Sequence, residues 1–117
     1  MYSADVKSFA SINKAIEAAV SESGIVELLV LSHGVSVPGT FEERSLEEMD
    51  HMIDTNLRGN IHAIKAALPH IKSSKGAPAS IAIFSSQAGQ VWTPLSLFDF
   101  FVDRLHVFSN FYNIMWS

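Results

Sequence analysis

Residues 25–34 read IVELLVLSHG, a short and mostly apolar run that stops at a polar turn. A second run of this kind, ASIAIFSS, covers residues 79–86 and ends in two hydroxyl side chains. Short apolar runs bounded by turn residues are typical of strands buried on both faces, as in a parallel sheet covered by helices. The two runs therefore predict two strands of a parallel sheet.

Helical patterns precede and separate the two predicted strands. Residues 8–22 place apolar side chains at helical spacing, and Gly24 follows them as a stop signal. Ser45 and Glu48 form a capping box that opens a longer helical stretch. Along this stretch one predicted apolar face comprises Met49, Ile53, Leu57, Ile61 and Ile64. The order helix, strand, helix, strand predicts an α/β fold, with residues 1–4 as the stub of an earlier strand.

Three segments are expected to share one edge of this sheet. In parallel sheets ligands bind at the carboxyl ends of the strands. Residues 4–6, 32–34 and 85–87 each follow a predicted strand or strand stub, so the topology brings them together. The topology thus predicts a common crevice along which Asp5, Gly34 and Ser86 lie.

The residues at this edge have purely structural interpretations as well as functional ones. Asp5 suits a contact to a ligand amine, or an ordinary helix N-cap, which is the commoner role. Gly34 allows close backbone approach to a ligand or simply forms a turn. His33 is a base only in a minority of such loops. Asn56 is a poor helix former inside a predicted helix, which favours a polar or water-linked site.

Composition excludes several classes of function. The formal net charge of −4 and the absence of a Lys or Arg block exclude a nucleic-acid surface. The chain has no cysteine, which excludes thiolate metal sites and disulfides. His62 and His70 lie eight residues apart, so no metal site is predicted and both are expected at the surface. No transmembrane segment or signal peptide is visible in the sequence.

The common catalytic and phosphate-binding motifs are missing from the chain. A nucleophile elbow requires G-x-S-x-G, but Phe84 stands two residues before Ser86. Neither G-x-x-x-x-G-K-[ST] nor G-x-G-x-x-G occurs. A serine hydrolase and a nucleotide site built on either of these loops are therefore not predicted.

Composition changes sharply near Val91. Eight of the twelve aromatic residues lie in residues 92–117, a stretch without Gly, Ala, Lys or Glu. All six glycines lie in residues 1–91. The chain is therefore predicted to consist of a domain segment, residues 1–91, and an aromatic-rich tail of a different kind, residues 92–117.

Five motifs together carry a family resemblance. ADV (4–6), HGV (33–35), IDTNLRG (53–59), IKAALP (64–69) and ASIAIFSSQAGQV (79–91) occur in the order and spacing of the short-chain dehydrogenase/reductase family. Over residues 3–91 the chain most resembles the 3-ketodihydrosphingosine (3-dehydrosphinganine) reductases of that family. The resemblance implies an incomplete Rossmann-like, doubly wound, three-layer parallel sheet, lacking the first strand and the region after the fifth.

The resemblance assigns cofactor contacts to five residues. Asp5 matches the acidic residue that contacts the adenine of the cofactor, and Val6 packs beside it. Ser32, His33 and Gly34 match the cofactor-lining segment usually written N-N-A-G, of which only the glycine is retained. The implied cofactor is NADPH. The glycine-rich turn that holds its pyrophosphate would lie before residue 1.

The resemblance also assigns catalytic roles. Asn56 matches the helix asparagine that holds a water in the proton relay. Ser86 matches the serine that hydrogen-bonds the substrate carbonyl, where negative charge develops as hydride arrives. The proton-donating tyrosine and its lysine should stand at positions 99 and 103, and both are aspartate here. Without that pair the general acid is missing.

Two functional hypotheses follow. The resemblance implies NADPH-dependent reduction of the lipid ketone 3-ketodihydrosphingosine in sphingolipid biosynthesis, by a parent enzyme associated with the cytosolic face of the endoplasmic reticulum membrane. The chain itself shows no membrane anchor. The departures at Asp99 and Asp103 imply instead a non-catalytic fragment or an interaction surface. A short-chain reductase with another keto substrate is the remaining alternative.

Overall fold

The two apolar runs pair as a parallel two-stranded sheet in the computed structural model, which describes residues 1–72 and 80–85. Strand β1 spans Leu28–Leu31 and β2 spans Ser80–Ile83, with Leu28 opposite Ser80 and Leu31 opposite Ile83. The Ser80 N–H donates to Glu27 O (2.9 Å), and the Phe84 N–H donates to Leu31 O (2.8 Å). The predicted strands are confirmed, although β1 begins three residues later than predicted and β2 ends at Ile83, before Phe84 and Ser85.

Helix α1 spans Phe9–Ser23. Ser8 is its N-cap, and the Ser8 Oγ accepts from the Ser11 N–H (3.3 Å). Gly24 ends the helix with a φ of 82°, a conformation that glycine adopts without steric cost, and its N–H donates to Val20 O (2.7 Å). Both the helix and its glycine stop were predicted from the sequence.

The second helical stretch changes its winding in the middle. After a short 3-10 turn, η1 (Phe41–Glu43), it consists of α2 (Leu46–Met52), a π-helical segment, η2 (Ile53–Arg58), and α3 (Gly59–Lys72). The predicted capping box is present: the Ser45 Oγ accepts from the Glu48 N–H (3.2 Å), and the Ser45 N–H donates to Glu48 Oε2 (3.0 Å).

The buried face of this stretch keeps α-helical spacing through the π segment. The predicted apolar face is confirmed only in part, because Met49 is buried and Ile64 packs against the core, whereas Ile61 is 56% exposed. A row of side chains four residues apart drifts by about 40° per step around a helix with 3.6 residues per turn, which carries Ile61 away from the core. The buried side chains are those of Met49, Met52, Thr55, Asn56, Asn60, Ala63, Ala66 and Ala67.

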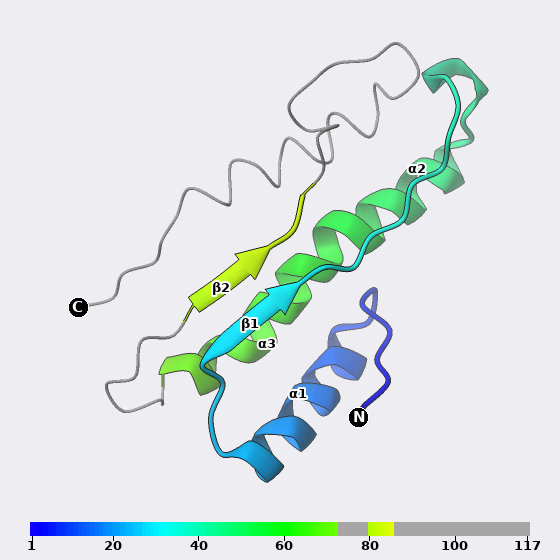
Figure 1. Ribbon diagram of the computed structural model, residues 1–117. Helices are drawn as coiled ribbons and strands as arrows, with labels where there is room; N and C mark the ends of the chain where they lie inside the picture. Colours follow the sequence, from blue (N-terminus) through cyan, green and yellow to red (C-terminus); the bar gives the residue numbers. More distant parts are fainter. Residues whose placement is uncertain (73–79, 86–117) are drawn as a thin grey trace.

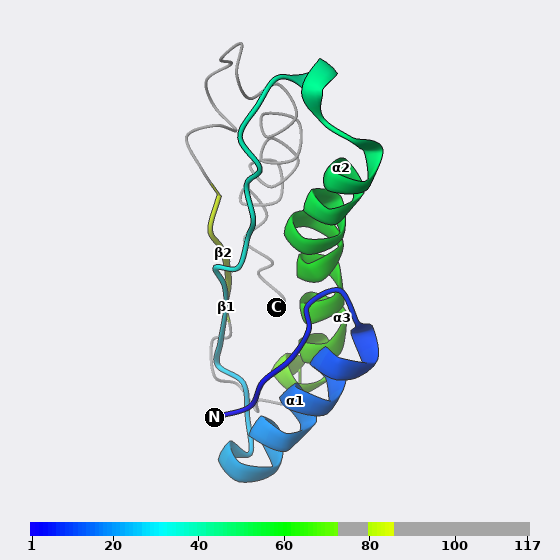
Figure 2. The same ribbon diagram turned by 90° about the vertical axis from the view of Figure 1, so that its right-hand side faces the viewer.

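The helices α1 and α3 lie side by side on one face of the sheet, with α2 continuing the line of α3 (Figures 1 and 2). The core between these layers consists of Ile12, Leu31, Ala63 and Ala66. The partly buried residues packed against it are Val6, Ile16, Leu29, Ile64 and Ile83. This parallel α/β arrangement belongs to the Rossmann class that the sequence predicts.

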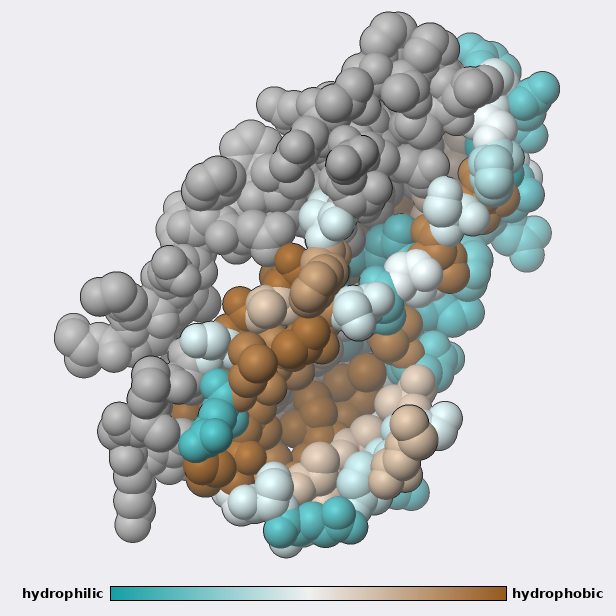
Figure 3. All heavy atoms as spheres, in the orientation of Figure 1, coloured by the Kyte–Doolittle hydropathy of each residue, from teal (hydrophilic) through white to brown (hydrophobic). Residues whose placement is uncertain are grey.

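The opposite face of the sheet differs from the prediction. Leu28 is 58% exposed and Val30 is 48% exposed, and both side chains alternate with the inward-facing Leu29 and Leu31. Apolar surface is visible over the strands in Figure 3, which looks at the molecule in the orientation of Figure 1. Strands buried on both faces were predicted, but helices cover only one face in the part of the chain that the structure describes.

Other predictions fall at the ends of the chain. Residues 1–4 form no strand, so the predicted strand stub is wrong. The polar loop at residues 73–79, Ser86 and the tail 92–117 lie outside the described residues. None of the helices within residues 1–72 has both the length and the apolar character needed to cross a membrane.

Candidate functional site

Val6 and His33 meet at the first residue of α3, beyond the carboxyl end of β1. A methyl group added at Gly59 would lie 2.9 Å from His33 Nε2 and 3.1 Å from Val6 Cβ. Real Cβ atoms essentially never approach within 3.0 Å of such a neighbour. We call this contact of Val6, His33 and Gly59 the Gly59 junction. It brings together two segments that the sequence analysis placed at one sheet edge.

Asn56 fastens the loop that follows β1 to the helical layer. Its Oδ1 accepts from the Val35 N–H (2.8 Å), and its Nδ2 donates to Val35 O (2.8 Å). The residue is 8% exposed, so both bonds are largely shielded from water. The side chain thus pairs with Val35 as a neighbouring strand would, which explains an asparagine within a helical stretch. Its predicted water-holding role stays a prediction.

The backbone oxygen of Asn56 has a partner of its own. The Asn60 Nδ2, one turn later and 4% exposed, donates to Asn56 O (2.8 Å). This bond lies at the change from η2 to α3, where the regular helical hydrogen bonding is altered. Asn60 therefore satisfies a carbonyl at the same point where Asn56 reaches across to Val35.

Gly34 is exposed and lies against Asn56. A methyl group added at Gly34 would lie 3.5 Å from Asn56 Oδ1, an ordinary van der Waals distance. Asn56 therefore does not require a glycine at this position. Backbone approach of a ligand and a simple turn stay the two interpretations of Gly34.

Asp5 is held by a tight local turn. Its Oδ1 accepts from the Lys7 N–H (2.9 Å), and its carbonyl oxygen accepts from the Ser8 N–H (3.0 Å). Its own N–H donates to Ser11 Oγ (3.0 Å). The N-cap interpretation of Asp5 is wrong, because its carboxylate closes a turn onto Lys7 and the N-cap of α1 is Ser8, three residues later. Asp5 is exposed.

His62 contacts this turn from α3. Its Nδ1 lies 3.1 Å from Val6 O, and its ring meets Phe9 edge-on, with centroids 5.9 Å apart and planes at 68°. The expectation that His62 is a surface residue is wrong, since the side chain is half-buried between α1 and the turn. No spacing pattern in the sequence pointed to this contact.

Gly59 was also absent from the predicted site, although a signal for it existed. A glycine within a helix costs about 1 kcal/mol relative to alanine, so it indicates a packing reason. The structure supplies that reason at the Gly59 junction.

The remaining predicted site residues follow the two strands. Ser32 is exposed, directly after β1, whereas the Nε2 of His33 is buried against Gly59. Ser85 is exposed, and the Phe84–Leu31 hydrogen bond holds it near Ser32. Ser86, the predicted catalytic serine, lies outside the described residues. The described residues contain no group of three or more His, Asp or Glu side chains placed to hold a metal ion.

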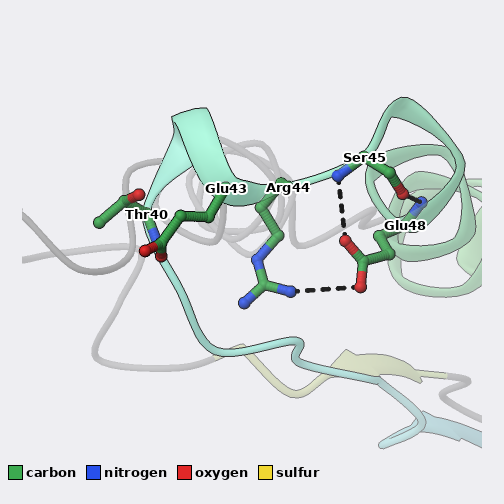
Figure 4. Close-up of polar contacts among 5 residues, drawn as sticks. All are labelled: Thr40, Glu43, Arg44, Ser45 and Glu48. Carbon is green, nitrogen blue, oxygen red and sulfur yellow. Dashed lines mark hydrogen bonds and ion pairs between the residues drawn. The ribbon is translucent and has the colours of Figure 1, made fainter.

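A second polar cluster lies farther along the chain, at the turn that leads into α2 (Figure 4). The Thr40 N–H donates to Glu43 Oε2 (3.0 Å), and Arg44 Nη1 lies 3.6 Å from Glu48 Oε1. Hydrogen bonds from the backbone and side chain of Thr40 lower the pKa of the Glu43 carboxyl below its usual value. These contacts join residues three or four apart, and none involves the Gly59 junction.

Comparison with known proteins shows the family context of this arrangement. The family model described as short chain dehydrogenase matches residues 1–97. One 3-dehydrosphinganine reductase of Arabidopsis thaliana is 46% identical over 89 residues, and a second from the same plant is 43% identical over 88 residues. The alignments cover 75% and 74% of this chain but 26% of each relative. The chain thus spans about a quarter of the length of these relatives.

Solved structures share the fold. The structure of ElxO with NADP bound has a TM-score of 0.84 and 27% identity, covering 92% of this chain and 43% of that chain. The 3-ketoacyl-(acyl-carrier-protein) reductase of Brucella melitensis, complexed with NADH, has a TM-score of 0.83 and 28% identity, covering 92% and 46%. The likeness therefore extends to structures solved with NADP and with NADH.

Proposed function

Since this chain belongs to the short-chain dehydrogenase family, we propose that it is part of a 3-dehydrosphinganine reductase. The observation that carries this substrate assignment is the 46% and 43% identity to two such reductases. In the proposed reaction a hydride passes from NADPH to the C3 carbonyl carbon of 3-ketodihydrosphingosine, and a proton is added to its oxygen. The products are the C3 alcohol, dihydrosphingosine, and NADP⁺.

The proposed cofactor contacts are compatible with the described geometry. Asp5 presents an exposed carboxylate on a turn fixed by three hydrogen bonds, a suitable acceptor for the adenine amino group. Val6 stands beside it at the Gly59 junction. Ser32 and Gly34 are exposed residues after β1, and the Nε2 of His33, between them, is buried against Gly59. The bound cofactor would supply the hydride, and these residues would hold its adenosine side.

The preference for NADPH rests on the family resemblance of the chain. The structures cited above contain NADP in one case and NADH in the other, so they support a nicotinamide cofactor of either kind. A comparison of the two affinities in this chain would decide the preference.

The proposed catalytic residues are Asn56 and Ser86. Asn56 would hold a water of the proton relay, with its side chain fixed by Val35. Ser86 would donate a hydrogen bond to the ketone oxygen, which gains negative charge as hydride arrives. We also propose that the parent enzyme lies at the cytosolic face of the endoplasmic reticulum membrane. Fractionation of cells that express it would test this location.

A second candidate function is cofactor binding without turnover. The observation that favours it is the pair of aspartates, Asp99 and Asp103, where the family has tyrosine and lysine. A carboxylate at position 99 cannot replace a tyrosine hydroxyl as a proton donor near neutral pH, since a free carboxyl has a pKa of about 3.9.

One experiment separates the two candidates. The purified chain is incubated with NADPH and 3-ketodihydrosphingosine, with NADPH consumption followed at 340 nm and cofactor affinity measured separately by calorimetry. Turnover that disappears in Ser86→Ala but persists in Ser85→Ala would support the reductase. Cofactor binding without turnover would support the second candidate. If neither NADPH binding nor turnover is observed, both candidate functions are contradicted.

A further inference from the structure

Among the described residues, the turn at residues 5–8 makes one hydrogen bond to α3, through its carbonyl at Val6. Hydrogen bonds within the turn and to Ser11 fix Asp5 relative to the start of α1. These bonds tie the turn only to its own helix. The Val6 O, by contrast, meets His62 on α3, 56 residues later in the sequence. This hydrogen bond therefore relates the turn to the layer that carries Asn56.

Gly59 and His62 act on Val6 together. They stand three residues apart on α3, so they occupy the same side of the helix. A methyl group at Gly59 would lie 3.1 Å from Val6 Cβ and 3.2 Å from Val6 Cγ2. The missing side chain at Gly59 thus admits the Val6 side chain, while His62 takes up the Val6 carbonyl.

The contact defines which tautomer His62 adopts. A backbone carbonyl only accepts hydrogen bonds, so the proton must be on Nδ1. The edge-on ring of Phe9, the first residue of α1, supports the imidazole plane on the side of the turn. His62 is therefore held in a donor orientation by its contacts with the turn and with the first residue of α1.

We propose that His62 is a positioning residue of the cofactor site, which sets the place of Asp5 and Val6 through the Val6 carbonyl. This inference rests on the proposed function, since it takes Asp5 and Val6 as contacts of the adenosine side. His62 itself need not touch the cofactor. Loss of its donor would leave the turn held to α3 only by the packing of Val6 on Gly59, so Asp5 and Val6 would be less firmly placed.

Two variants separate the donor from the ring. His62→Phe keeps an aromatic ring against Phe9 but removes the hydrogen bond. His62→Asn removes the ring but places an amide nitrogen near the position of Nδ1. His51→Phe, an exposed histidine on α2, is the control. In each purified chain we would measure NADPH affinity and the hydrogen-exchange rates of the Lys7 and Ser8 amides.

Both the NADPH affinity and the exchange rates should depend on the hydrogen-bond donor at position 62. We expect His62→Phe to weaken NADPH binding about threefold to tenfold, as the loss of one hydrogen bond predicts, and to speed exchange at Lys7 and Ser8. His62→Asn should recover most of both losses, and His51→Phe should change neither. Unchanged affinity in His62→Phe would overturn the proposal, and so would an Asn variant that behaves like the Phe variant.

The tautomer gives a test that needs no variant. Long-range ¹H–¹⁵N spectra of the unmodified chain should show His62 protonated at Nδ1, and a neutral ring protonated only at Nε2 would overturn the proposal. Failure of the unmodified chain to bind NADPH would contradict the proposed function and with it the cofactor part of this inference. Normal NADPH binding with unchanged His62→Phe affinity would contradict this inference alone.

Discussion

The candidate site and the turn at residues 40–48 are both rich in polar contacts, yet they are built in different ways. In the turn, hydrogen bonds and the ion pair join residues three or four apart. In the site, Asn56 reaches Val35 across 21 residues, and His62 reaches Val6 across 56. The turn is therefore fixed by its own sequence, whereas the site exists only when α3, β1 and the first turn are assembled.

This difference predicts where substitutions have large effects. The Asn56–Val35 and His62–Val6 contacts of the site are partly buried and join separate elements, so their loss leaves polar groups unsatisfied inside the fold. The hydrogen bonds of the turn are exposed, so water replaces them readily, although the side chain of Arg44 is largely buried. The following experiments disrupt contacts in one region or the other, and they are given in order of decreasing expected effect.

Asn56→Leu should have the largest effect. It leaves the Val35 N–H and carbonyl without their side-chain partner in a region that is largely shielded from water. We expect the free energy of unfolding to fall by about 2–4 kcal/mol, measured by urea denaturation. A loss below about 0.5 kcal/mol would mean that the Asn56–Val35 pairing does not hold the site together.

Gly59→Ala should have the next largest effect, and Gly34→Ala is its matched control. The added methyl group at Gly59 would press on His33 Nε2 and Val6, while at Gly34 it would meet Asn56 at an ordinary distance. We expect a loss of about 1–3 kcal/mol at Gly59, even though alanine favours helix. The change at Gly34 should stay within about 0.5 kcal/mol. Equal unfolding midpoints for the two variants would refute the close packing at the Gly59 junction.

The two regions also differ in how far the sequence predicts them. The Ser45–Glu48 capping box is a local motif, and the structure has it as predicted. Gly24 likewise ends α1 as its position suggests. By contrast, no sequence signal marks the π segment Ile53–Arg58, and the apolar spacing wrongly placed Ile61 on the buried face. The expected parallel α/β fold is thus confirmed, while the predicted apolar face of its longest helical stretch is confirmed only in part.

The candidate site was predictable only in part, because its contacts join residues far apart in the sequence. Family motifs drew attention to Val6 and His33, which the structure brings together at Gly59, and to Gly34 and Asn56, which it places side by side. They could not show that Asn56 pairs with the backbone of Val35. Nor could they show that His62 holds the Val6 carbonyl, because a single histidine 56 residues away has no pattern in the sequence.

Ser45→Ala tests the local region. The substitution removes the acceptor for the Glu48 N–H at the start of α2. Loss of an N-cap of this kind should cost about 1 kcal/mol, less than the loss expected for Asn56→Leu. Ser45→Asp restores an acceptor and should recover most of the stability in the same denaturation experiment. A cost at Ser45 as large as that at Asn56 would erase the difference between the two regions.

The smallest effect concerns the pH dependence of the turn. The pKa of Glu43 is lowered in the folded chain, so its carboxylate stabilises the turn above the usual value of 4.5. That contribution is lost as the pH falls through the lower, folded value. The Thr40 amide, which donates to Glu43, should report this titration by NMR with a midpoint below 4.5. A midpoint at or above 4.5 would contradict the assignment, and Glu43→Gln should abolish the titration.

The most direct test of the whole account is to map NADPH binding on the amide spectrum of the unmodified chain. If residues 1–85 carry the adenosine side of a dehydrogenase cofactor site, NADPH should shift the amides of Asp5, Val6, His33 and Gly34. The amides of Arg44 and Glu48, in the locally built turn, should stay in place. Shifts confined to the turn, or no shifts at millimolar NADPH, would contradict the account.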